Sequence, residues 1–423
     1  MDFASRYLED KAISRPLFTG TPEKDTAIII IIPAFDEAGI IKTIDSLLNC
    51  TKPACSIELI VLVNAPVHAS AEQMEQNERT CTGLSEWQEK NTDSFIRLLW
   101  YNTGKMNVPG WGVGMARKMA MDEAVRRLSR IDQPEGVLVS LDADCTVASN
   151  YLVELYERLY KKDQHKACSV YFEHPQEGDM PEGVYRAILQ YELHLRYYYR
   201  SLKYTGYPWV FHTLGSAIAV KARHYVRAGG MSKRQGAEDF YFIQKLVPAG
   251  GYFYLNTTVV NPSPRASLRV PFGTGPVISS MLAGKKDDYM SYNPEAFSVL
   301  RQFFAGIKDY YSRDIRPAGE LMSGFKPGLR EFLAMNSWPD NLRLIRNNTS
   351  SQESFTKRFF TWFNMFRIVK YLNFVHARGY HEKMPVEPAA RAMLRMNGVE
   401  HKAHGAKELL AVYRRLERLS PEV

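Results

Sequence analysis

The chain has 423 residues, 45% hydrophobic and 24% charged, which is the composition of a soluble globular protein large enough for two compact parts. Its longest aliphatic run, residues 27–32, is far shorter than the roughly 20 residues that cross a bilayer, and its N-terminus is charged, so we expect neither a spanning helix nor a signal peptide. The five cysteines contain no Cys-x-x-Cys pair, which favours reduced thiols, no zinc site and a cytoplasmic location.

Positive charge is concentrated near the C-terminus. The whole chain carries a formal net charge of +8, and residues 340–423 hold fifteen Lys or Arg against eight Asp or Glu. Such a basic region suits an anionic inner membrane surface or a phosphate-bearing acceptor, although a solvated helical surface explains it equally well. The sequence contains no recognisable nucleic-acid-binding motif beside this basic region, so we expect no nucleic-acid partner.

Strands and helices are predicted to alternate from residue 27 onward. Continuous apolar runs predict buried strands, and runs with a period of 3.6 residues predict helices between them. The predicted strands are 27–32, 57–63, 95–100 and 137–141, and the predicted helices are 40–48, 112–128 and 150–160. This alternation predicts an α/β fold, doubly wound, with a mostly parallel sheet and helices on both faces.

The second half of the chain has a different pattern. Residues 166–254 are mixed, with a tyrosine-rich helix over 182–203, a strand over 216–220 and a helix after Ala237. Beyond Gly275 the chain is expected to form helices and loops. We therefore predict an α/β domain over residues 1–275 and a helical C-terminal region over 276–423, basic from about residue 340.

Two carboxylates follow the predicted strand 137–141. Alternation in an extended chain sends Asp142 and Asp144 to the same side, where both can face one hard divalent cation. Two acids after a strand also occur as a cap before a helix, and a helix is predicted to begin near Asn150.

A sharp turn from strand to helix follows the first strand. Pro33 stiffens it, Phe35 offers a flat face to a nucleobase, and Glu37 can accept hydrogen bonds from a base or ribose. The alternative is a proline-stiffened turn before an acidic helix N-terminus. Asn64, after the next strand, is predicted to lie at the same edge of the sheet.

Three further segments offer charged groups. Arg117 follows two glycines at a helix start and can neutralise phosphate oxygens, although a close-packed helix with a surface arginine is also consistent. Glu238 and Asp239 open a helix, where the helix dipole alone favours carboxylates, or where Asp239 acts as a general base. Arg265 and Arg269 precede a glycine-rich end and could grip phosphates or form an exposed basic loop.

The acceptor side is the least distinct part of the predicted site. His212 and Gly215 lie just before a predicted strand and Ser216 begins it, at the edge where ligands are expected. A single histidine is more often structural than functional, so both interpretations stay open.

Taken together, these segments resemble a glycosyltransferase of family 2 with the GT-A fold, in a soluble and non-processive form. The matching order is Ile32-Pro-Ala-Phe-Asp-Glu37, Ile60 to Asn64, Gly114 to Arg117, Leu141-Asp-Ala-Asp144, Gly215-Ser216 and Glu238-Asp239. The resemblance implies a hexosyltransferase-type enzyme with a UDP- or GDP-linked sugar donor, in which residues 1–275 are the nucleotide-sugar-binding and catalytic domain. It also implies a Mg or Mn ion and one inverting displacement onto an acceptor hydroxyl of a carbohydrate, a lipid-linked molecule or a small molecule.

The resemblance also implies a role for each matching position. Asp144 corresponds to the metal ligand, with Asp142 on the metal or the donor ribose, and Asp239 corresponds to the base. Pro33, Glu37 and Asn64 correspond to nucleoside-binding positions, and Arg117 to a donor-contacting arginine. The chain departs from the family where Asn64-Ala65-Pro66 replaces the usual acidic residue followed by Gly-Ser, which leaves the choice between uridine and guanosine open.

Two other functions fit parts of the sequence. Asp142-Ala-Asp144-Cys-Thr146 also matches the haloacid-dehalogenase phosphatases, in which Asp142 would be the nucleophile. A non-catalytic GT-A-like binding module with a basic tail is the third alternative.

Overall fold

The computed structural model describes residues 2–233, 237–269, 273–284, 288–312 and 318–420. The chain divides into two compact units. We call them the sheet unit (Met1–Tyr185, His212–Ser279 and Arg418–Val423) and the helical unit (Arg186–Phe211 and Ser280–Glu417). The division differs from the predicted boundary after Gly275 mainly because residues 186–211 group with the helical unit.

Within the described residues, the sheet unit contains an eight-stranded sheet with the order β3-β2-β1-β4-β7-β6-β8-β5. Its strands are β1 (Thr26–Ala34), β2 (Ser56–Pro66), β3 (Ile96–Met106), β4 (Val137–Ser140), β5 (Thr146–Val147), β6 (Ala167–Phe172), β7 (Ile218–Lys221) and β8 (Tyr252–Asn261). The β1–β2, β2–β3, β1–β4 and β6–β8 pairs are parallel, whereas β7 is antiparallel to both β4 and β6, and β5 is antiparallel to β8.

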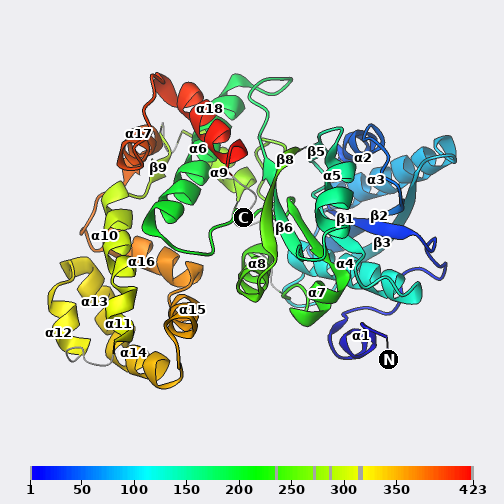
Figure 1. The fold of residues 1–423 in the computed structure, drawn as a ribbon. Coiled ribbons are helices and arrows are strands. Elements are labelled where there is room, and N and C mark those ends of the chain that lie inside the picture. The colour runs from blue at the N-terminus through cyan, green and yellow to red at the C-terminus, as the bar shows by residue number, and fades with distance from the viewer. Residues whose placement is uncertain (1, 234–236, 270–272, 285–287, 313–317, 421–423) are drawn as a thin grey trace. The chain divides into compact units, whose positions relative to one another are not determined.

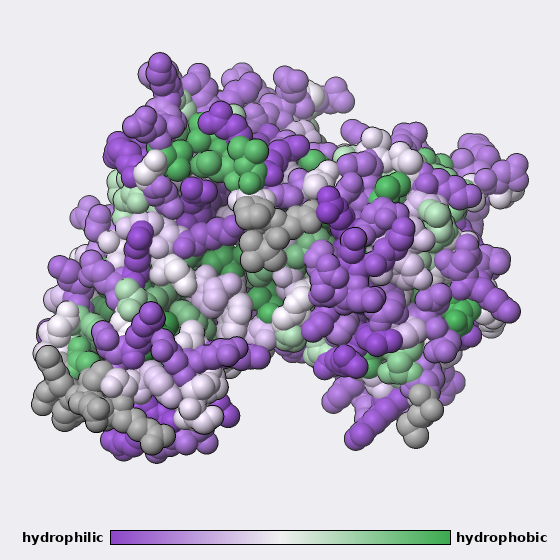
Figure 2. Space-filling model, viewed as in Figure 1, coloured by the Kyte–Doolittle hydropathy of each residue, from purple (hydrophilic) through white to green (hydrophobic). Residues whose placement is uncertain are grey.

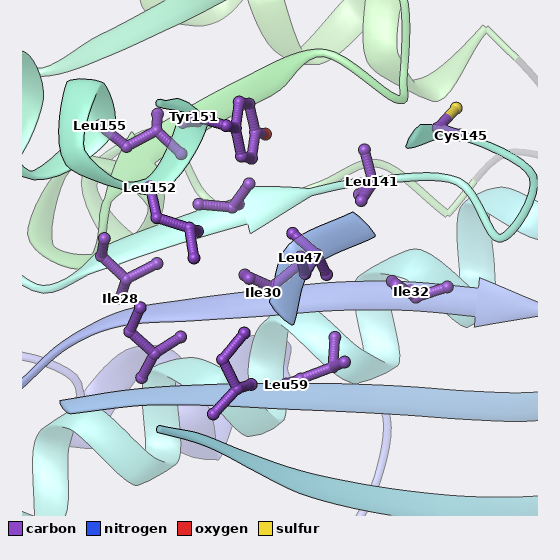
Figure 3. Close-up of a cluster of buried hydrophobic side chains, with 14 of the residues drawn as sticks. Ile28, Ile30, Ile32, Leu47, Leu59, Leu141, Cys145, Tyr151, Leu152 and Leu155 are labelled. Carbon is purple, nitrogen blue, oxygen red and sulfur yellow. The ribbon is translucent and has the colours of Figure 1, made fainter. Parts of the chain in front are cut away.

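The isoleucines of β1 alternate between the two faces of the sheet. Ile28, Ile30 and Ile32 point toward one cluster, which includes Leu47 and Leu152, as Figure 3 shows. Each isoleucine is fully buried, which stabilises the fold by about 1.5–3 kcal/mol per side chain. A strand that is buried on both faces reads as a continuous apolar run, and this explains why β1 was readily predicted.

Helices cover both faces of this sheet (Figure 1). Residues of α2, α3 and α5 share the cluster of Figure 3, whereas α4 contacts β1 and β2 from the other face. The helices of this unit are α1 (Ser5–Lys11), α2 (Ile40–Leu48), α3 (Ala71–Lys90), α4 (Val113–Arg130), α5 (Tyr151–Leu155), α7 (Ala222–Arg227) and α8 (Glu238–Leu246). The predicted α/β class and its mostly parallel, doubly covered sheet are confirmed.

The sequence patterns did not predict α3, β6 or β8. Helix α3 is largely polar and begins at a capping box, in which the Ser70 hydroxyl accepts from the Gln73 amide at 3.2 Å and the Gln73 side chain accepts from the Ser70 amide at 3.1 Å. Strands β6 and β8 pair in parallel although about eighty residues separate them, so only the assembled sheet reveals them as neighbours.

The helical unit is built around aromatic side chains. Phe303 packs against Trp338, Phe359 and Phe363, with ring centroids 5.3–5.6 Å apart. Its helices are α10 (Pro294–Ala305), α11 (Ile307–Tyr311), α12 (Ala318–Ser323), α13 (Pro327–Met335), α14 (Trp338–Asn347), α15 (Gln352–Trp362), α16 (Met365–Ala377) and α17 (Val386–Met396), together with most of α6 (Glu182–Thr205) and α18 (Gly405–Arg418). Helix α9 (Thr274–Leu282) falls at the division, and β9 (Met290–Ser291) pairs with β10 (Met384–Pro385). The expected helical C-terminal part is confirmed.

No helix in the described part of the chain is both long enough and apolar enough to cross a bilayer. On the face seen in Figure 2, hydrophilic residues predominate and hydrophobic ones form small separate areas.

Candidate active site at the carboxyl edge of the sheet

The topology gathers polar side chains at one edge of the sheet. Parallel strands β1, β2 and β4 all end there, so the residues after Ala34, Val63 and Ser140 are neighbours. Strand β7 runs antiparallel to β4, and its start therefore lies at the same edge. Every residue of this candidate site belongs to the sheet unit.

The loop that carries the two aspartates is held by its backbone. The Leu141 amide donates to the Ile31 carbonyl at 3.0 Å, and the Thr43 hydroxyl donates to the Ala143 carbonyl at 2.9 Å. The side chains of Asp142 and Asp144 are 39% and 25% exposed, respectively. Both carboxylates are therefore reachable from solvent on a fixed loop.

Arg117 joins two of the predicted site residues beneath the surface. Its guanidinium donates to Asp142 at 2.6 Å and also pairs with Glu238, and its side chain is only 3% exposed. Burial alone would lower the pKa of Arg117, but the carboxylates of Asp142 and Glu238 outweigh it and raise the pKa above its ordinary value. Arg117 is thus a permanent cation that holds two acidic segments together, and contact with a donor stays a prediction.

Gly215 leaves the space that Arg117 occupies. A Cβ atom added at this glycine would lie 2.9 Å from both terminal nitrogens of the guanidinium. The Ser140 hydroxyl donates to the Gly215 carbonyl at 2.6 Å and fixes the loop against the end of β4. Glycine is needed here for close approach to a charged side chain.

Two arginines from the loop after β8 reach the turn after β1. Arg265 donates to Glu37 Oε1 at 2.9 Å, pairs with the second oxygen of that carboxylate, and lies 3.1 Å from Asp144 Oδ2. Arg269 donates to the carbonyls of Phe35 at 2.6 Å and Asp36 at 2.9 Å. The two arginines therefore bind the first strand's turn, while residues 270–272 of the same loop lie outside the described residues.

The edge carries an excess of negative charge. Six carboxylates (Asp36, Glu37, Asp142, Asp144, Glu238 and Asp239) accompany three guanidinium groups (Arg117, Arg265 and Arg269). Burial raises the pKa of Asp144 to about 7; the charge of Arg265 opposes this shift, and the charges of Asp142 and Glu37 add to it. Burial likewise raises the pKa of Glu37 above its ordinary value, although Arg265 opposes the shift.

Asp239 stands at the first turn of α8. The preceding Ala237 has a left-handed backbone (φ 55°), which turns the chain into the helix, and Gly236 lies outside the described residues. The Asp239 carboxylate accepts from the Phe240 amide at 2.7 Å. Burial, and then the charge of Glu238, raise the pKa of Asp239 to about 7, while Arg117 opposes this. A carboxyl with such a pKa can exchange a proton near neutral pH.

Asn64 is held by protein groups. Its amide donates to the Ala34 carbonyl at 2.9 Å, and its oxygen accepts from the Trp111 indole at 3.1 Å. Asn77 then bridges the two strand ends, donating to the Asn64 carbonyl and accepting from the Asp36 amide, each at 2.9 Å. Sequence reasoning missed Asn77, because the helix that carries it was not predicted, and gave Trp111 no role.

Pro33 lies where its missing amide costs little. The pairing of β1 with β4 ends at Ile31, so Pro33 extends beyond the last hydrogen-bonded residue on that side. Phe35 follows at the strand end and is half-buried, and its carbonyl receives Arg269. The predicted contacts of Pro33 and Phe35 with a nucleoside stay predictions.

The predicted acceptor residues are more deeply buried. His212 is 6% exposed, and its ring lies 5.0 Å from that of Phe172 and 5.9 Å from that of Tyr254. Ser216 is also buried, next to Gly215. This packing accounts for His212 as part of the core, and an acceptor role for these residues stays a prediction.

The donor set fits a divalent cation whose shell a ligand would complete. Among the described residues, no three His, Cys, Asp or Glu side chains converge as a metal site. Asp142 and Asp144 nevertheless supply two hard oxygen ligands in a net-negative setting. Mg²⁺ is commonly bound by one or two carboxylates plus substrate phosphates, and a metal site at Asp142 and Asp144 stays a prediction.

No family model and no curated protein matches this chain. Among solved structures, it is similar to S. aureus TarS residues 1–349 in complex with UDP-GlcNAc (13% identity, 92% of this chain and 90% of that chain, TM-score 0.38). It is also similar to the mannosyltransferase PcManGT from Pyrobaculum calidifontis in complex with GDP-Man and Mn²⁺ (13% identity, 98% and 92%, TM-score 0.35).

Proposed function

We propose that this protein is a glycosyltransferase with a GT-A-type, family 2-like sheet unit, which transfers one sugar from a UDP- or GDP-linked donor to an acceptor hydroxyl with inversion. The observation that carries the proposal is the net-negative edge of the sheet, where Asp142 and Asp144 lie on a fixed loop beside Glu37. The motif order in the sequence supports the same conclusion.

Asp144 and Asp142 would hold the divalent cation. When bound, a cation of this kind neutralises the charge that develops on a departing nucleoside diphosphate without any proton transfer. The buried guanidinium of Arg117 donates to the Asp142 carboxylate and so keeps it in one orientation. The acceptor is a carbohydrate, a lipid-linked molecule or a small molecule.

Arg265 lies between Glu37 and Asp144 and contacts both carboxylates. An arginine there supplies positive charge to a carboxylate cluster that would otherwise repel itself. When diphosphate oxygens arrive, the same guanidinium can turn from carboxylate to phosphate, because both present paired oxygens to its planar fork. Arg269 keeps the loop attached to the turn after β1 while this exchange occurs.

Asp239 serves as the base that takes the proton of the acceptor hydroxyl. Its raised pKa suits this task, because the carboxyl can hold a proton near neutral pH and release it afterwards. Glu238, paired with Arg117, fixes the start of the helix and so the position of Asp239.

Donor binding tests the proposal directly. UDP-glucose, UDP-GlcNAc and GDP-mannose are each added with Mn²⁺ or Mg²⁺, and thermal unfolding is followed. A ligand at one hundred times its Kd stabilises the folded state by about 2.7 kcal/mol. Asp144→Asn should abolish the metal-dependent part of this stabilisation. Asp25→Asn, an exposed aspartate at the other end of β1, is the matched control and should behave as the wild type.

Two outcomes would overturn the proposal. If no sugar nucleotide stabilises the wild type with either metal, the donor assignment is wrong. If phosphate is released from a phosphomonoester and Asp142→Asn abolishes this release, the protein is a phosphatase that uses Asp142 as nucleophile.

A further inference from the structure

A cavity lies at the edge of the sheet that is opposite to the candidate active site. It has a volume of 230 Å³ and is bounded by the start of β6, the end of α7, the end of α8 and the start of β8. Figure 1 shows α7 and α8 near each other at this end of the sheet. The six residues of β6, roughly 20 Å of strand, separate this edge from the carboxyl edge.

Four of the ten residues that line the cavity are basic, and the other six are alanine, glycine, leucine and tyrosine. The basic residues are Lys166, His224, Arg227 and Lys245, and no carboxylate belongs to the lining. Among the described residues, no carboxylate lies within ion-pair distance of the two lysines or the arginine. The nearby Glu135 already pairs with two other cations, Lys221 at 3.0 Å and Arg223.

The position of Lys166 is built into the backbone. Gly251 has a left-handed backbone (φ 75°), and a Cβ atom there would lie 2.8 Å from Lys166 Cγ and 2.6 Å from the Gln164 carbonyl oxygen. Because Gly251 has no Cβ atom, the aliphatic part of the Lys166 side chain can lie across the turn, where its ammonium donates to the Ala249 carbonyl at 3.3 Å. A long, charged side chain is thereby held beside the cavity.

Helix ends account for only part of this charge. Arg227 and Lys245 lie in the last turns of α7 and α8, where the helix dipole favours cations. Lys166 precedes strand β6 and does not end a helix, so a helix dipole does not explain its position. Burial, followed by the charges of Lys166 and Arg227, lowers the pKa of His224 to about 4, while the charge of Glu135 opposes the shift.

We propose that this cavity binds the phosphate group of a phosphomonoester. Lys166, Arg227 and Lys245 would offset the two negative charges, and the neutral His224 ring would donate one hydrogen bond. The volume exceeds that of a phosphate ion, and Leu246 and the Tyr252 ring provide an apolar wall for a small organic group. The site is independent of the sugar donor and does not rest on the proposed glycosyl transfer.

NMR of the full chain with ¹³C-labelled histidine tests this proposal, using inorganic phosphate and glycerol 3-phosphate as probes. The His224 resonance is identified by its loss in His224→Gln. Bound phosphate should raise the His224 pKa from about 4 toward its ordinary value of about 6.5. Lys245→Glu should weaken phosphate binding at least about tenfold, whereas the matched exposed variant Lys24→Glu should change it less than about twofold.

Vesicles distinguish the source of the phosphate. If the group is a lipid headgroup, vesicles with phosphatidic acid should bind the wild type and compete with glycerol 3-phosphate, while phosphatidylcholine vesicles should not. If the ligand is a small molecule, only the soluble probes should shift His224. The proposal is overturned if neither probe nor vesicle shifts His224, or if Lys245→Glu and Lys24→Glu weaken binding equally. Asp144→Asn should leave the shift intact, which separates this site from the donor site.

Discussion

Replacing Arg117 by Met tests whether this residue holds the candidate active site together. Methionine has a similar length and no charge, so the change leaves Glu238 buried at 3% exposure without its cation. Asp142, which is 39% exposed, loses the same partner but remains in contact with water. The two carboxylates should therefore respond differently.

The expected cost follows from that difference in exposure. Removing one partner of a buried ion pair typically destabilises a protein by about 3–5 kcal/mol, because the remaining charge is uncompensated. An exposed pair contributes about 0–1 kcal/mol, so most of the loss should come from Glu238. Because whole proteins are stable by only about 5–15 kcal/mol, Arg117→Met should remain folded but be markedly weaker.

Urea unfolding followed by circular dichroism measures this effect, with the midpoint and the slope reported separately. Adding Glu238→Gln to Arg117→Met should recover at least about 1 kcal/mol, since the uncompensated charge is removed. Adding Asp142→Asn instead is the matched control and should recover less than about 0.5 kcal/mol. The reasoning is refuted if Arg117→Met unfolds within about 1 kcal/mol of the wild type, or if both second substitutions rescue it equally.

Three further predictions concern other parts of the chain. Asp239→Asn should lower the rate of sugar transfer about 10²–10⁴-fold. Because the ionised form is the base and the pKa of Asp239 is raised to about 7, kcat/KM of the wild type should rise with pH up to that value and then level, and a flat profile would contradict the assignment. Gly215→Ala should lower the free energy of unfolding by about 1–3 kcal/mol, because its Cβ would lie 2.9 Å from the Arg117 guanidinium; unchanged urea unfolding would contradict this contact. Glu192→Gln should lower the free energy of unfolding of the helical unit by about 1.5–3 kcal/mol, because it removes a buried carboxylate that accepts from Arg196 and Arg414, while Arg196 keeps its pair with Glu417 at 2.7 Å; hydrogen exchange of α6 and α18 measures the loss.

The strands that carry the candidate site could be predicted because buried strands are continuous runs of apolar residues in the sequence. A strand such as β1, covered on both faces, must be apolar throughout, and the polar residues that follow it then mark the sheet's edge. Strand alternation does not extend to Asp142 and Asp144, because β4 ends at Ser140 and the Cys145 amide closes a turn on the Asp142 carbonyl at 3.2 Å; their shared metal role stays a prediction. The polar helix α3 carried no such signal, because a capping box and an exposed face leave little apolar periodicity.

Local sequence determined the class of fold and which side chains are available at the sheet's edge. Only the tertiary structure decided their partners: Arg265 binds Glu37 across 228 positions, and Arg117 binds Glu238 across 121. The same holds for the basic cavity, whose lining comes from four separate elements. The physical reason is that hydrophobic periodicity acts over a few residues, whereas ion pairing and charge balance depend on which distant segments the strand order brings within a few ångströms of each other.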